Sequence, residues 1–213
     1  MKAFYDKRIF VMVCINAALY VLILITDIDY LKYAAIIACL LICIFGLSHP
    51  RRRVALIQTV VFGFTLAADF ILLFAPSPYF ATGVFVFFGA HICALIRYRP
   101  RWVLPACICA AAALLITMAG MKMATEAAAS CAYAILIISV TITTFFAEQP
   151  RINKLFSRLG MLLFIACDIN VAAFNALLPG GAGHAAAGFL MWAFYLPAQT
   201  LLALSATTLA TDE

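Results

Sequence analysis

The sequence has few charged residues for its length. Aspartate, glutamate, lysine and arginine make up 11% of its 213 residues, whereas a typical soluble domain has about 25%. Hydrophobic residues make up 67% and the mean hydropathy is +1.11. The 14 basic and 9 acidic side chains are too few to cover the water-facing surface of a chain this size. This scarcity excludes a soluble domain, a disordered chain and a nucleic-acid-binding protein, and it indicates a polytopic membrane protein.

Motifs of the common hydrolase mechanisms are also missing. The sequence has no Gly-x-Ser-x-Gly, no His-Glu-x-x-His, no P-loop and no dinucleotide-binding fingerprint. All eight cysteines lie in apolar stretches, where cysteine behaves as a small hydrophobic residue. His49, His91 and His184 are expected at three different membrane depths, which is unfavourable for one zinc site. We therefore expect neither a metal nor a cofactor.

Long apolar runs account for most of the chain. A membrane-spanning helix needs about 20 mostly apolar residues. The first run begins after basic residues, as in a signal peptide, but it continues to Ile25 without a small-residue cleavage site, so we interpret it as a retained helix. The sequence predicts an all-α bundle of eight transmembrane helices in one domain, residues 1–213, with helices at about 9–26, 30–47, 54–75, 79–97, 101–119, 124–147, 155–178 and 185–207.

Basic residues alternate between the two predicted sides of the membrane. Twelve of them fall at the N-terminus and in the second, fourth and sixth loops, and only Lys32 and Lys122 fall on the opposite side. The twelve are Lys2, Lys7, Arg8, Arg51, Arg52, Arg53, Arg97, Arg99, Arg101, Arg151, Lys154 and Arg158. Because basic loops stay in the cytoplasm, this pattern predicts that both termini are cytoplasmic. The short loops and the lack of a eukaryotic targeting signal favour a bacterial inner membrane.

Three ionisable residues are predicted at membrane depth: Asp69, His91 and Asp168. A charged side chain at the bilayer centre costs about 2.5–3.5 kcal/mol on insertion scales, so each should face protein or a wet cavity. Asp69 and Asp168 lie roughly 9 Å and 15 Å from the external ends of their helices. These depths are compatible with one shared cavity, although two structural hydrogen-bond anchors would also explain them.

Other polar residues accompany the aspartates. Asn175 is two helical turns after Asp168, and Tyr195 and Gln199 are one turn apart in the last helix. Pro197 lies between them, and it should leave the carbonyl of Ala193 without its helical hydrogen bond. Singly, Tyr195 and Gln199 are more typical of contacts between helices than of a site.

Two blocks of the sequence resemble the YhhN family of lysoplasmalogenase-like membrane proteins. The first runs from Ala67 through Asp69 to Leu73, and the second from Gly160 through Cys167-Asp168 to Asn175. The first block continues downstream in Phe80, Gly83 and Gly89-Ala90-His91. The second continues in Phe194-Tyr195-Leu196-Pro197-Ala198-Gln199 and Leu202-Ala203-Leu204-Ser205. Ala68, Cys167 and Pro197 depart from the family's usual residues but leave both aspartates in place.

The resemblance implies hydrolysis of the vinyl-ether bond of a lysoplasmalogen, a lysophospholipid of the bilayer. The products would be a fatty aldehyde and glycerophosphocholine or glycerophosphoethanolamine. Asp69 lies in the first of these blocks and Asp168 in the second, so the resemblance implies that they are the acid and the base. Tyr195, Gln199 and Asn175, with His91 in a secondary role, are the expected substrate- or water-binding residues.

The chemistry of a vinyl ether is consistent with two carboxyl groups. The bond is cleaved by protonation of its β-carbon, addition of water to the resulting oxocarbenium ion and collapse of the hemiacetal. Glycosidases handle an oxocarbenium-like state with a similar pair of carboxyl groups. Two alternatives remain open: a proton-coupled small-molecule transporter in which the aspartates relay protons, and a non-catalytic lipid-binding or scaffold protein in which they are structural.

Overall fold

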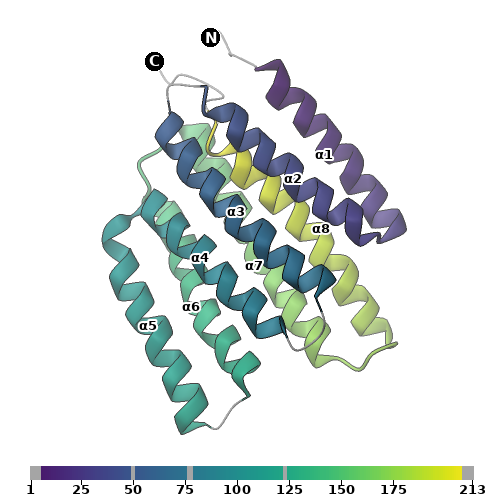
Figure 1. Cartoon of the computed structure of the whole chain (residues 1–213), viewed down its shortest axis with the longest axis vertical. Helices are drawn as coiled ribbons and strands as arrows, with labels where there is room; N and C mark the ends of the chain where they lie inside the picture. Colours follow the sequence, from purple (N-terminus) through teal and green to yellow (C-terminus); the bar gives the residue numbers. More distant parts are fainter. Residues whose placement is uncertain (1–5, 49–50, 76–78, 122–123, 208–213) are drawn as a thin grey trace. The chain divides into compact units, whose positions relative to one another are not determined.

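A computed structural model describes residues 6–48, 51–75, 79–121 and 124–207 (Figure 1). Within these ranges the chain has no strands and has eight helices that are long and apolar enough to cross a membrane. The helices are α1 (Lys7–Thr26), α2 (Asp29–Gly46), α3 (Arg52–Phe74), α4 (Phe80–Tyr98), α5 (Val103–Leu115), α6 (Thr125–Phe146), α7 (Arg151–Ala176) and α8 (Ala182–Leu204). The all-α class with eight spanning helices is therefore confirmed.

The fifth and seventh helices differ most from their expected bounds, and α8 (Ala182–Leu204) lies three residues earlier than predicted at both ends. The fifth apolar run is divided: Pro100–Trp102 forms a 3₁₀ turn, α5 follows, and Ile116–Gly120 continues as a π-helical segment. Helix α7 begins at Arg151, four residues before the predicted start. Polar residues in its first turns lower the local hydropathy there, although the backbone is already helical.

The contacts divide the chain into two compact units. One contains Met1–Arg52 and Gln149–Glu213, and the other contains Arg53–Glu148. The first unit therefore contains α1, α2, α7 and α8, and the second contains α3 to α6. The single-domain organisation stays a prediction.

In the first unit, α8 packs against α7, α2 and α1. Its contact with α7 depends on Gly160, where a Cβ atom would lie 2.9 Å from Cγ of Leu202 and 3.2 Å from the carbonyl oxygen of Ala198. Small residues allow helices in membranes to approach each other closely. Gly160 therefore sets the separation of α7 and α8.

Polar side chains hold α1 to the rest of this unit. The side-chain nitrogen of Asn16 donates to Oγ1 of Thr200 at 2.7 Å and to Sγ of Cys39 at 3.2 Å. The hydroxyl of Tyr20 donates to the carbonyl oxygen of Ala193 at 3.1 Å. Pro197 has no N–H to offer this carbonyl. Tyr20 thus supplies the hydrogen bond that the proline removes from α8.

In the second unit, α4 and α5 pack against α6. Side chains of α3 lie against two glycines of α4: Leu72 is next to Gly83, and Phe64 is next to Gly89. These contacts fix an antiparallel register for α3 and α4. That register also positions Arg97 to donate to Oε1 of Gln58.

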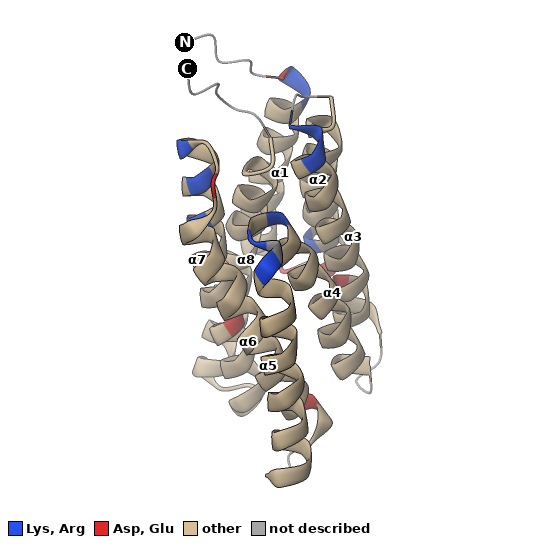
Figure 2. Cartoon of the chain, turned by 90° about the vertical axis from the view of Figure 1, so that its left-hand side faces the viewer, with Lys and Arg blue, Asp and Glu red and all other residues tan. Residues whose placement is uncertain are grey.

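Most of the basic residues of each unit lie at one end of that unit (Figure 2). In the first unit they mark the starts of α1 and α7, while Arg8 lies over the ring of Phe45 at 5.2 Å and Asn153 donates to the carbonyl of Ser205 at 3.0 Å. The first contact joins the start of α1 to the end of α2, and the second joins the start of α7 to the end of α8. In the second unit the basic residues mark the start of α3 and the junction of α4 and α5. Lys32, at the start of α2, lies at the other end of the first unit and pairs with Asp27 and Asp29.

This distribution leads to a topology test. Reporter fusions placed after Asp29 and after Glu213 should report opposite sides of the membrane, the first external and the second cytoplasmic, because basic ends stay in the cytoplasm. A pair of reporters, one active only in the cytoplasm and one only outside it, would check this. The same side for both fusion sites would contradict the predicted orientation.

Candidate functional site

Asp69 is buried on the protein-facing side of α3. Its exposed fraction is 5%, and it lies five residues before the last residue of the helix. The buried residues of α3 recur every three or four positions along one face: Ala55, Gln58, Phe62, Thr65, Ala68 and Asp69. Thr65, one turn earlier, donates from Oγ1 to the carbonyl of Val61 at 3.0 Å. The carboxyl group of Asp69 is therefore removed from both lipid and bulk water.

His91 is buried in α4 of the same unit. Its Nδ1 donates to the carbonyl oxygen of Phe87 at 2.9 Å, and its ring meets that of Tyr133 edge-on with centroids 5.0 Å apart. In the register of α3 and α4, His91 is level with Phe64, five residues before Asp69. That offset corresponds to roughly 8 Å along the helix. His91 is thus held by an aromatic group and is not at the same level as Asp69.

Asp168 lies half-buried in α7 of the first unit. It is one helical turn after Phe164, whose ring packs edge-on against Tyr195 of α8 with centroids 5.6 Å apart. Further along, Phe174 of α7 lies against Gly188 of α8. Asp168 therefore lies between two places where α7 and α8 are in direct contact.

Tyr195 and Gln199 form a buried polar pair on α8. Their exposed fractions are 5% and 2%. The ring of Tyr195 lies between those of Phe164 and Trp192, and the Trp192 centroid is 5.4 Å away. Among the described residues, nothing accepts a hydrogen bond from Nε2 of Gln199. A buried amide donor without a protein partner is uncommon, and it suits a water molecule or a ligand oxygen.

Asn175 lies apart from this pair. It is exposed near the end of α7, and its side-chain nitrogen donates to the carbonyl of Val171 at 2.8 Å. Eleven residues separate it from Phe164, the α7 residue that contacts Tyr195, or roughly 16 Å along the helix. Asn175 and Tyr195 are thus at different depths.

Several buried polar contacts are not among the features predicted from the sequence, and those of Asn16 and Arg97 join different helices. Asn16 is 3% exposed and links α1 to α2 and α8. Arg97 had been counted only as a loop charge, but its side chain donates to buried Gln58 and its guanidinium lies 4.7 Å from the ring centre of Tyr98. The available signal was a single Asn or Gln inside an otherwise apolar run.

The eight apolar helices make this chain an integral, multi-pass membrane protein. A sequence model of the YhhN family matches residues 28–206, which include every helix from α2 to α8. The chain belongs to the YhhN family. Neither a curated protein nor a solved structure matches it.

Proposed function

We propose that the protein hydrolyses the vinyl-ether bond of lysoplasmalogens, with Asp69 and Asp168 as its acid and base. The observation that carries this proposal is the burial of Asp69 on the protein-facing side of a membrane-spanning helix. Carboxyl groups at membrane depth are costly and are typically functional. The second aspartate lies half-buried in another spanning helix, and the family membership is consistent with a hydrolase.

The reaction needs one proton donor and one proton acceptor. A neutral carboxylic acid gives its proton to the β-carbon of the vinyl ether, and the adjacent carbon becomes an oxocarbenium ion. Water adds to that carbon and loses a proton to the second, ionised carboxyl group. The hemiacetal then breaks its bond to the glycerol oxygen, which takes a proton and leaves with the glycerophospho-alcohol while the aldehyde remains.

An apolar setting makes this division of roles possible. A carboxyl group removed from water favours its neutral form, whereas a carboxylate with polar neighbours keeps its charge. We assign one protonated and one ionised carboxyl group to the pair at neutral pH. The vinyl-ether bond of a lysolipid lies near the glycerol, so the reaction takes place in the shallow part of the bilayer.

The remaining polar residues have supporting roles in this proposal. The Nε2 group of Gln199 donates to the water or the ether oxygen, and the hydroxyl of Tyr195 holds the same group from one turn away. Asn175, exposed near the end of α7, contacts the polar part of the lysolipid. His91 is secondary, because its Nδ1 hydrogen is engaged by Phe87.

The test is release of free aldehyde by the purified protein. The detergent-solubilised chain is incubated with a lysoplasmalogen and, in parallel, with the matching alkyl-ether lysolipid. Only the vinyl ether has a carbon that accepts a proton, so only it should yield aldehyde. A proton-coupled transporter would instead take up a solute into proteoliposomes and release no aldehyde from either lipid.

Strong chelators are expected to leave this turnover unchanged. The mechanism uses carboxyl groups alone, and within the described ranges no three His, Cys, Asp or Glu side chains are close enough to hold a metal ion. The rate of aldehyde release would be compared before and after dialysis against a chelator. Loss of turnover that added zinc restores would overturn the metal-independent mechanism.

A further inference from the structure

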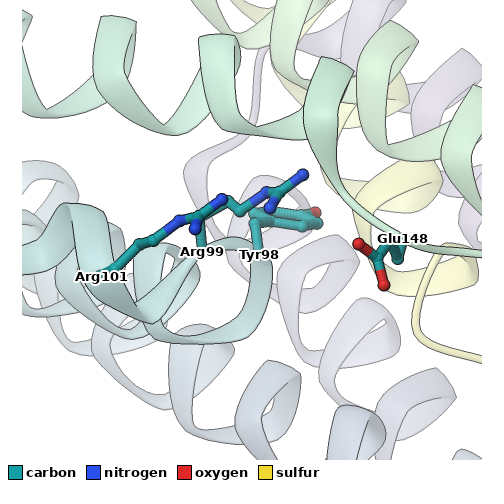
Figure 3. Close-up of a pocket in the computed structure, with 4 residues that line it drawn as sticks. All are labelled: Tyr98, Arg99, Arg101 and Glu148. Atoms are coloured by element: carbon teal, nitrogen blue, oxygen red, sulfur yellow. The ribbon is translucent and has the colours of Figure 1, made fainter.

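A pocket of about 430 Å³ opens where α4 ends, α5 begins and α6 ends. Tyr98, Arg99, Arg101 and Glu148 line it (Figure 3). In this view the Arg101 side chain extends toward Arg99, and the Tyr98 ring and the carboxyl group of Glu148 lie beyond it. All four residues belong to the second unit.

The pocket is distinct from the proposed catalytic group. The register of α3 and α4 places Asp69 beside the part of α4 that lies about 12 residues before Tyr98. Asp69 and Tyr98 are therefore roughly 18 Å apart along the axis of α4. The pocket lies at the end of α4, where the spanning segment stops. Trp102 follows it with 41% of its surface exposed. Aromatic residues of this kind mark the level of lipid headgroups.

The two arginines present unused hydrogen-bond donors to the pocket. Arg99 gives one N–H to the carbonyl of Phe146, which anchors its guanidinium and leaves other donors of the same group for a ligand. Arg101 forms no ion pair or hydrogen bond with any described residue. Guanidinium groups form paired hydrogen bonds with the oxygen atoms of phosphate and carboxylate groups, and at the headgroup level of a bilayer the common anion is a phosphate. This half of the pocket is suited to a phosphate.

Glu148 favours a ligand that also carries a positive charge. Its carboxylate also lines the pocket, is exposed, and has no cationic partner among the described residues. A ligand with only negative charge would be repelled by it. A primary ammonium group next to the phosphate would be attracted and would donate hydrogen bonds that a quaternary ammonium lacks.

We propose that this pocket binds a phosphoethanolamine group, with the phosphate on Arg99 and Arg101 and the ammonium on Glu148. Its position at the headgroup level points to phosphatidylethanolamine of the bilayer as the source, and soluble glycerophosphoethanolamine carries the same chemistry. Basic pockets between helices on the cytoplasmic side commonly take lipid headgroups. The site is separate from the proposed hydrolysis and does not depend on it.

Native mass spectrometry of the detergent-solubilised protein tests the site. The protein is offered equal amounts of dioleoyl-phosphatidylethanolamine and dioleoyl-phosphatidylglycerol, and the bound lipid is identified. Wild type should retain mainly the ethanolamine lipid. The double variant Arg99→Gln/Arg101→Gln should bind it about tenfold to thirtyfold more weakly. Its matched control, Arg52→Gln/Arg53→Gln, removes the same charge from exposed residues outside the pocket and should bind like wild type.

A single variant tests the ammonium half. Glu148→Gln should bind the glycerol lipid as well as the ethanolamine lipid, because the repulsion of the purely anionic headgroup is gone. Adding glycerophosphoethanolamine at the same concentration as the lipid separates the two sources. If it displaces the bound phosphatidylethanolamine, the site belongs to the soluble compound. If the lipid stays bound, the site belongs to the bilayer lipid. Wild type that shows no preference between the two lipids, or a double variant that binds like its control, would overturn the proposal.

Discussion

Replacing either Asp69 or Asp168 with asparagine should lower the rate of aldehyde release by about 10²- to 10⁴-fold, the usual contribution of a general acid or base. Asparagine keeps the size and polarity of the side chain but cannot exchange a proton. Because asparagine fills nearly the same volume as aspartate at these buried and half-buried positions, the substitution should leave the helices folded. Initial rates with a vinyl-ether lysolipid would be measured for both variants.

Glu126→Gln is the control for this pair. Glu126 is an exposed carboxylate in the first turn of α6, so removing its charge should leave the rate at the wild-type value. A thermal unfolding curve for each variant separates loss of catalysis from loss of folding. A well-folded variant that keeps more than about a tenth of wild-type turnover would show that its aspartate is neither the acid nor the base.

The second large effect concerns stability. Gly160→Ala should lower the free energy of unfolding of the first unit by about 1–3 kcal/mol, the usual cost of overpacking a tight contact. The added methyl group would lie 2.9 Å from Leu202 and 3.2 Å from the Ala198 carbonyl, so α7 and α8 must separate or Leu202 must move. Unfolding by sodium dodecyl sulfate in mixed micelles would measure the change.

Gly63→Ala provides the matched comparison. Gly63 lies in the middle of α3 and has no atom within 4 Å of an added Cβ. There alanine should be neutral or stabilise the helix by up to about 1 kcal/mol, because it restricts the unfolded backbone more than glycine does. Equal destabilisation by the two substitutions would mean that helix propensity, rather than the α7–α8 contact, governs Gly160.

The sequence predicted those structural features that are determined within a single helix. The apolar runs placed the eight helices to within a few residues, because a spanning segment must satisfy its own backbone hydrogen bonds. The hydroxyl groups of Ser139, Thr141, Thr143 and Thr144 also donate to carbonyls of their own helix, three or four residues earlier. The burial of Tyr195 and Gln199 likewise agrees with a polar stripe on one face.

Features that join distant helices were not accessible in the same way. Pro197 predicted a carbonyl at Ala193 without a helical partner, but nothing local indicated that Tyr20, 173 residues away, would supply it. The pocket at Glu148 has the same origin. It exists because the end of α6 meets the junction of α4 and α5, and residues 99–101 and 148 give no sign of this separately.

Hydrolysis of a lysoplasmalogen in heavy water tests the central claim most directly. If a carboxyl group of the protein protonates the β-carbon, that proton comes from solvent, and aldehyde reduced at once to the alcohol should carry one deuterium on carbon 2. The Asp69→Asn and Asp168→Asn proteins should produce almost none of this product. Aldehyde without deuterium, or no aldehyde from well-folded wild type, would contradict acid–base cleavage of the vinyl ether by this protein.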